Sequence, residues 1–141
     1  MESSRRVVRI WLFAPGENAF FWTEQYEAGE AAIGWGYLED LTQYKSKHEI
    51  MERLVELNQP KQRPINNALA CWQFAHEVKV GDWIIAKNGQ RLLVGYGKVR
   101  SDYFYDPDRA KYRHIRKVDW LNKGEWTTDV NLVTKTLTDL T

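Results

Sequence analysis

The sequence predicts an α+β fold: a partly open β-barrel of about five or six strands with two or three flanking helices. Three observations carry this prediction. Apolar residues repeat at helical spacing within residues 46–78, and from Lys79 onward the period changes to two, which is typical of strands. Glycines interrupt the apolar strands, as they do where a barrel wall bends sharply. At 141 residues the chain has the size of one domain, so we expect residues 1–141 to form a single domain.

The first quarter of the chain predicts a strand, a short helix and a second strand. Residues 6–13 are rich in β-branched and aromatic residues and end at a Pro-Gly turn signal. Asn18 is placed to cap an amphipathic helix over residues 19–26, and Gly29 is a typical residue for its end. Residues 31–37 then predict the second strand.

Two longer helices are expected next. Ser46 and Glu49 have the spacing of a capping box, and the helix that they begin should end near Asn58, before a proline. Residues 66–78 predict a third helix, capped by one of two adjacent asparagines and apolar enough to be largely buried.

The second half of the chain predicts the wall of the barrel. Asn88 and Gly89 form the strongest hairpin signal in the sequence, and Asn122 to Gly124 marks a further turn. Gly95 and Gly97 indicate a bulge or a bend. We expect strands over residues 83–87, 91–99, 112–121 and 130–140.

Composition narrows the functional classes. The net charge of +1 does not suit a protein that coats DNA indiscriminately, although five basic residues crowd into residues 109–117. The single cysteine forms no internal disulfide, and we see neither an apolar run that would span a membrane nor a targeting segment, so we expect a cytoplasmic protein. The sequence has no phosphate-binding loop, dinucleotide fingerprint or metal-spaced ligand pair, so we predict neither cofactor nor metal, and no enzyme activity in this domain.

A catalytic interpretation has two candidate centres. Cys71 lies within an apolar helix, the usual place for a small buried residue. His114, with Asp106 and Asp119 nearby in the sequence, could support acid–base chemistry; the alternatives are a hydrogen-bonded structural histidine or a phosphate contact.

The aromatic residues favour a binding interpretation. Seven Trp and seven Tyr are many for so short a chain, and several lie beside glycines or in polar stretches. A base flipped out of a duplex needs flat surfaces for stacking and polar groups for its Watson–Crick edge. Trp35 lies between two glycines that leave its face open, and the loop with Tyr103, Tyr105 and Asp106 offers both kinds of group. The alternative for this loop is a well-packed connection, with the aspartate capping a turn.

Two further residues and a set of cations complete the predicted site. Trp22 and Asn18 could form a second wall and a hydrogen-bonding amide, although packing of Trp22 between helix and barrel is the alternative. Basic side chains on the later strands would hold phosphates, or would serve as a solvated strand edge that discourages aggregation. The predicted phosphate contacts are Lys98, Arg100, Arg109, Lys111 and Arg113.

The order of the segments "WLFAPGENAFFW", "AIGWGYLEDLTQY" and "YFYDPDRAKYRHIRKVDW" resembles the EVE/PUA-like N-terminal domains of McrB-type proteins over nearly the whole chain. The resemblance implies a PUA-like fold and recognition of methylated DNA for a modification-dependent restriction system, with a nuclease subunit as partner through the rest of a longer parent chain that could carry an AAA+ motor. This sequence has no motor motifs, so we expect a domain excised from such a chain, and a stand-alone reader is the alternative. The EVE fold is similar to YTH domains, which hold N6-methyladenine in an aromatic cage. By that similarity Trp35 matches a cage tryptophan, and the second wall would fall near Tyr103 or Tyr105, where this sequence has no tryptophan.

Three other functions stay open at this point. The domain could read modified RNA instead of DNA, because sequence does not show a 2′-hydroxyl contact. It could be a small nucleotide-processing enzyme that uses Asp106 and His114, or a protein-interaction module whose exposed aromatic residues meet a partner protein.

Overall fold

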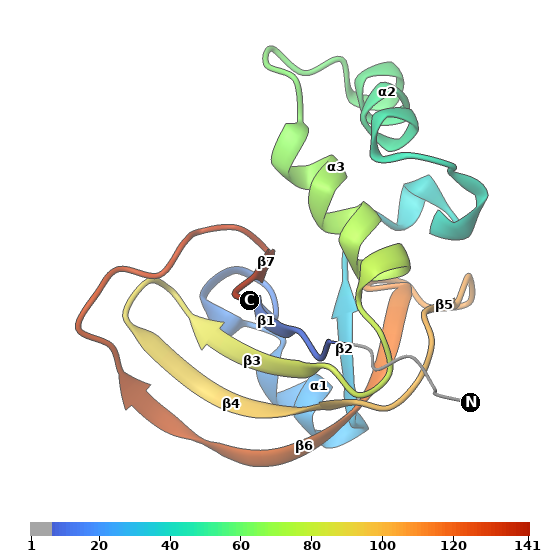
Figure 1. Cartoon of the computed structure of the whole chain (residues 1–141). Helices are drawn as coiled ribbons and strands as arrows, with labels where there is room; N and C mark the ends of the chain where they lie inside the picture. Colours follow the sequence, from blue (N-terminus) through green and yellow to red (C-terminus); the bar gives the residue numbers. More distant parts are fainter. Residues whose placement is uncertain (1–6) are drawn as a thin grey trace.

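The structure, a computed structural model, describes residues 7–141 and confirms the α+β class with a partly open barrel and flanking helices (Figure 1). Six strands form one hydrogen-bonded path, and the short strand β5 (Phe104–Tyr105) pairs with β6 beside it. The six are β1 (Ile10–Phe13), β2 (Glu30–Ile33), β3 (Trp83–Asn88), β4 (Leu92–Val99), β6 (His114–Thr127) and β7 (Leu137–Asp139).

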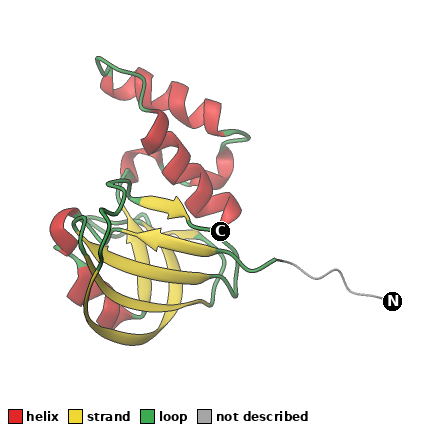
Figure 2. Ribbon diagram, turned by 60° about the vertical axis from the view of Figure 1, so that its left-hand side comes forward, coloured by secondary structure: helices red, strands yellow, loops and turns green. Residues whose placement is uncertain are grey.

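Helices close one end and one side of this barrel. Figure 2 shows the strands curled together, with the pair α2 (Lys47–Asn58) and α3 (Ile65–Trp72) above one end and α1 (Trp22–Ala28) beside the wall. Among the described residues no helix has the length and apolar character that crossing a membrane requires. Short turns complete the chain: η1 (Glu17–Ala19), η2 (Gly36–Leu38), η3 (Leu41–Gln43) and the π-helical η4 (Gln73–Glu77).

The sheet curls because the long strand β6 pairs with β2 and with β4 along different parts of its length. The start of β6 pairs with β2 and its later part pairs with β4, while β1 lies parallel to β3 and antiparallel to β7. The strand order β2-β6-β4-β3-β1-β7 leaves β2 and β7 as the two edges, so the barrel stays partly open. The amide of Gln25 covers the β2 edge: it donates to the carbonyl of Ala32 and accepts from the N–H of Ala32.

Gly95 and Gly97 bend the wall as the sequence predicts. The pairing of β4 with β6 shifts register at both glycines. A Cβ on Gly95 would overlap the ring of Trp22, and one on Gly97 would overlap the backbone carbonyl of Asp119. These positions therefore require glycine because a ring and a strand approach the backbone closely.

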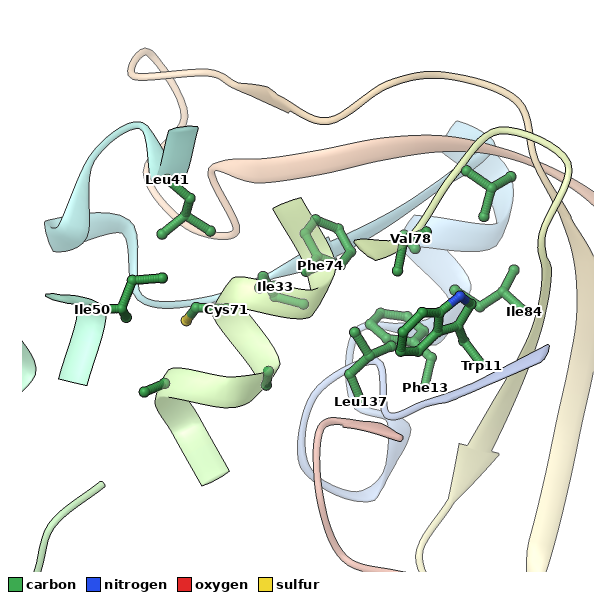
Figure 3. Packing of buried hydrophobic residues seen from close by; sticks show 14 of the residues in the cluster. Trp11, Phe13, Ile33, Leu41, Ile50, Cys71, Phe74, Val78, Ile84 and Leu137 are labelled. Carbon is green, nitrogen blue, oxygen red and sulfur yellow. The ribbon is translucent and has the colours of Figure 1, made fainter. Parts of the chain in front are cut away.

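One apolar core joins the barrel to the helical pair. Figure 3 shows side chains from both layers meeting around α3, so the helices are held to the end of the barrel by shared packing. Its fully buried members include Trp11, Phe13, Leu137, Ile50, Cys71 and Phe74.

Several helix and turn signals are confirmed. The Ser46 hydroxyl accepts from the N–H of Glu49 at the start of α2. Gly29 ends α1 in the left-handed conformation, and the Asn88-Gly89 step leads from β3 into the antiparallel β4.

Other boundaries differ from the prediction. The strand expected over residues 6–13 begins at Ile10, and residue 6 lies outside the described residues. The strand expected over residues 31–37 ends at Ile33, since the chain turns left-handed at Trp35. Asn18 caps no helix, because it lies inside η1 with φ 53°.

Two more corrections concern caps and turns. The helix expected from residue 66 begins at Ile65 after Pro64, and no asparagine side chain caps it. Asn122 to Gly124 forms no turn, because Lys123 and Asn122 pair with β4 within the continuous strand β6.

Candidate functional site

Trp35 occupies an unusual backbone conformation directly after β2. Its φ of 63° and ψ of 36° place it in the left-handed region, which costs a bulky residue roughly 1–2 kcal/mol. The carbonyl of Trp35 accepts from Nε2 of His114 at 2.9 Å. A Cβ on Gly34 would meet nothing within 4 Å, so open space lies beside the turn. Strained residues of this kind concentrate at ligand sites.

A buried hydrogen-bond chain holds this turn. His114 is completely buried, and its Nδ1 lies 2.8 Å from the hydroxyl of Tyr103, which itself accepts from the N–H of Leu41 at 3.0 Å. The Trp35 carbonyl can only accept, so Nε2 of His114 carries the proton and Nδ1 accepts from Tyr103. Burial lowers the pKa of His114, which keeps the ring neutral in this role.

Two cavities flank Trp35 and share it with Gly34 and Tyr112. We call them the Glu17 cavity, about 350 Å³, and the Arg113 cavity, about 470 Å³. Both volumes lie in the range of small-ligand sites, about 300–1,000 Å³. The Glu17 cavity is further lined by Ala14, Gly16, Glu17, Ile33, Thr134 and Thr136. The Arg113 cavity is further lined by Phe21, Gly36, Tyr37, Ala110, Lys111 and Arg113.

Tyr112 is the second aromatic residue common to both cavities. It too is left-handed, with φ 55°, and its ring centroid lies 4.5 Å from that of Phe21. Within residues 7–141 its hydroxyl makes no hydrogen bond, and burial raises the pKa of that hydroxyl. Tyr112 therefore offers a flat face and an available hydroxyl.

The two cavities differ in charge. Glu17 is the charged residue among the described residues that line the first, and Lys111 and Arg113 are those of the second. No ion pair between described residues engages these three side chains. Nε of Arg113 donates to the carbonyl of Arg109, which orients the guanidinium and leaves its two terminal nitrogens available.

Most other cations of the basic segment are occupied inside the protein. Arg109 makes two hydrogen bonds of 2.6 and 2.9 Å to the buried carboxylate of Glu30, and Lys117 lies 3.6 Å from that carboxylate. The guanidinium of Arg116 donates to three backbone carbonyls, two of them in η4. The predicted phosphate role of Arg109 is therefore not supported, because its charge is already paired.

Lys98 and Arg100 lie elsewhere on the barrel. Lys98 places its ammonium 5.0 Å from the ring centroid of Trp83, and Arg100 pairs with Asp119 at 3.0 Å. Neither lines the cavities beside Trp35. Of the five cations predicted from the sequence, Lys111 and Arg113 are the two at this site.

The predicted second wall in the loop before β6 supports the site from behind. Tyr103 packs against the core and forms the hydrogen-bond chain described above, and it lines neither cavity. The hydroxyl of Tyr105 reaches the carbonyl of Gly36 at 3.4 Å. Asp106 accepts from the N–H of Asp108 and lies 3.5 Å from Arg109, as a residue that caps a turn does.

Trp22 and Asn18 are also absent from both cavities. Trp22 is buried between α1 and the barrel, where its ring meets Trp120 edge-on with centroids 4.7 Å apart. Asn18 is exposed in η1 and lines neither cavity, whereas its neighbour Glu17 does line one. The alternative interpretation of Trp22 as a packing residue is the one that the structure supports.

The catalytic alternatives find little support in this geometry. Both ring nitrogens of His114 have partners, and the carboxylate of Asp106 is engaged in its turn. Cys71 is fully buried, and burial raises the pKa of its thiol. Within the described residues no group of three or more metal-ligating side chains gathers.

Sequence reasoning missed Tyr112 and Glu17 as members of the site. Tyr112 lies in a basic stretch that predicts an ordinary strand, and nothing in its neighbours signals a left-handed tyrosine. Glu17 adjoins Asn18, which the sequence favours as a hydrogen-bonding amide. Thr134 and Thr136 come from the far end of the chain, so only folding brings them beside Trp35.

Comparison with known families places the chain. A family model described as "Domain of unknown function (DUF8426)" matches residues 11–141, and the chain belongs to that family. No curated protein matches the sequence.

Proposed function

We propose that this domain binds nucleic acid by accepting one unpaired base against Trp35 while Lys111 and Arg113 contact the adjoining phosphates. The observation that carries the proposal is the left-handed Trp35, fixed through its carbonyl by buried His114 and flanked by two cavities of opposite charge. The hydrogen bond fixes the backbone at Trp35, and the ring packs partly against the core. Base stacking on the remaining face of such a ring contributes roughly 1–3 kcal/mol per base.

The available cations supply the second half of the proposal. Lys111 and Arg113 line the Arg113 cavity together with Trp35. A nucleotide stacked on the ring would therefore place its phosphate close to these two positive charges. Tyr37 borders the same cavity, and its hydroxyl accepts from Asn58 of α2 at 2.9 Å. This hydrogen bond connects α2 to the rim of that cavity.

The identity of the nucleic acid is proposed from the resemblance in sequence. The similarity to EVE/PUA-like N-terminal domains of McrB-type proteins favours DNA with a methylated base, read as the specificity module of a modification-dependent restriction system. The base would leave the duplex to reach Trp35, at a cost of a few kcal/mol for unstacking and unpairing. Modified RNA is the alternative ligand.

A fluorescence anisotropy titration tests this function. Labelled duplexes carry 5-methylcytosine, 5-hydroxymethylcytosine, N6-methyladenine or no modification, and single-stranded DNA and RNA of the same sequence are included. Trp35→Ala should weaken binding of the preferred ligand by about 5- to 150-fold and remove its preference for the modification. Arg113→Ala should weaken all ligands alike and lower the slope of log K against log salt by about 1.

Matched controls separate the site from general effects. Trp126→Ala removes an exposed tryptophan that lines neither cavity. Arg91→Ala removes an exposed arginine that also lines neither cavity. Both controls should bind like the unaltered protein. Failure of every ligand to bind at low salt would overturn the proposal, and so would equal losses for Trp35→Ala and Trp126→Ala.

A further inference from the structure

The two cavities beside Trp35 suit different parts of one nucleotide. The Arg113 cavity is lined by two cationic residues, and the Glu17 cavity is lined by Glu17, Thr134, Thr136 and Tyr112, whose side chains bear one carboxylate and three hydroxyls. A phosphate is attracted to the first and repelled by the second, whereas a neutral base with hydrogen-bonding edges suits the second. The orientation of a bound nucleotide follows from this difference in charge.

We infer that the base enters the Glu17 cavity, and that Glu17 selects bases with an exocyclic amino group over thymine and uracil; this inference rests on the proposed function. A carboxylate accepts hydrogen bonds and donates none, so its partner must carry N–H groups. The amino groups of cytosine, adenine and guanine meet that requirement. Thymine and uracil carry a single N–H on this edge, and the two carbonyl oxygens that flank it repel a carboxylate.

The neighbouring hydroxyls complete the match. In cytosine and adenine the amino group lies next to a ring nitrogen that accepts a hydrogen bond. A hydroxyl can donate or accept, so a threonine or Tyr112 can satisfy this nitrogen while Glu17 takes the amino group. Glu17 itself has no ion pair within residues 7–141, so its oxygens are available for a base.

Isosteric base pairs test this selection directly. Single-stranded oligonucleotides of one sequence carry cytosine or uracil at a central position, and a second pair carries adenine or hypoxanthine there. Each pair exchanges an amino group for a carbonyl oxygen and the adjacent ring nitrogen for an N–H, while the shape of the ring is kept. The unaltered protein should prefer the amino-bearing member by about tenfold, as expected for a hydrogen bond to a charged group.

The matched variants are Glu17→Gln and Glu27→Gln. Glutamine offers both a donor and an acceptor, so Glu17→Gln should reduce the preference to about twofold or less. Glu27 is exposed on α1 and lines neither cavity, so Glu27→Gln changes the net charge equally and should retain the preference.

The outcomes distinguish this inference from the function on which it rests. If Trp35→Ala abolishes binding while the unaltered protein treats cytosine and uracil alike, the role of Glu17 is wrong and the proposed function stands. A preference that survives Glu17→Gln overturns the role in the same way. If no oligonucleotide binds, or if Trp35→Ala binds normally, both proposals fail.

Discussion

Tyr103→Phe should destabilise the domain by removing one buried hydroxyl. That hydroxyl accepts from the N–H of Leu41 and donates to Nδ1 of His114, and both of those residues are fully buried. Each lost hydrogen bond costs about 1 kcal/mol, and an orphaned buried group adds to this, so we expect a loss of roughly 2–3 kcal/mol.

The expected change in melting temperature follows from the chain length. With about 2.1 cal/mol/K per residue, the 141 residues give an unfolding entropy near 0.3 kcal/mol/K, so the melting temperature should fall by about 7–10 °C. Differential scanning calorimetry measures both quantities. The control is Tyr96→Phe, which removes an exposed hydroxyl without a hydrogen bond to the described residues. Melting temperatures within about 2 °C of each other for the two variants would refute the assigned hydrogen-bond chain.

Two further predictions concern His114 and Gly95. Burial lowers the pKa of His114 below its ordinary 6.5, so the folded state binds fewer protons than the unfolded state, and stability should fall as the pH drops from 6.5 toward the lowered pKa. Urea titrations between pH 7.5 and 5.5 measure this loss, which should be smaller in His114→Gln; equal losses would contradict it. Gly95→Ala should cost about 1–3 kcal/mol, because its Cβ would overlap the ring of Trp22, whereas Gly34→Ala meets open space. Thermal melts of both variants decide the comparison, and a Gly95→Ala variant as stable as Gly34→Ala would count against the packing.

Much of the fold follows from local signals in the sequence. The start of α2 at Ser46, the end of α1 at Gly29 and the hairpin at Asn88 depend on capping and turn chemistry within a few residues. The sequence predicts a bend at Gly95. It does not predict that the ring of Trp22 leaves no room for a Cβ there, since the two residues are far apart in the sequence.

The candidate site was predicted only in part. Trp35 was found because two glycines flank it, and Lys111 and Arg113 because basic residues cluster. The same cluster contains Arg109, and composition cannot show that buried Glu30 neutralises it. Charge in a sequence reports which groups exist, whereas tertiary pairing decides which of them remain available to a ligand.

By itself the sequence determined the α+β class, the helical pair and the bent barrel wall, because hydrophobic period, capping and glycine placement act over short distances. Only the tertiary structure decided which aromatic residues face open space. Tyr103 was expected in the pocket and lies behind it, while Tyr112 was overlooked and lines both cavities. The physical reason is that two left-handed backbone turns, held by His114 and by packing on Phe21, set these directions through contacts between residues far apart in the chain.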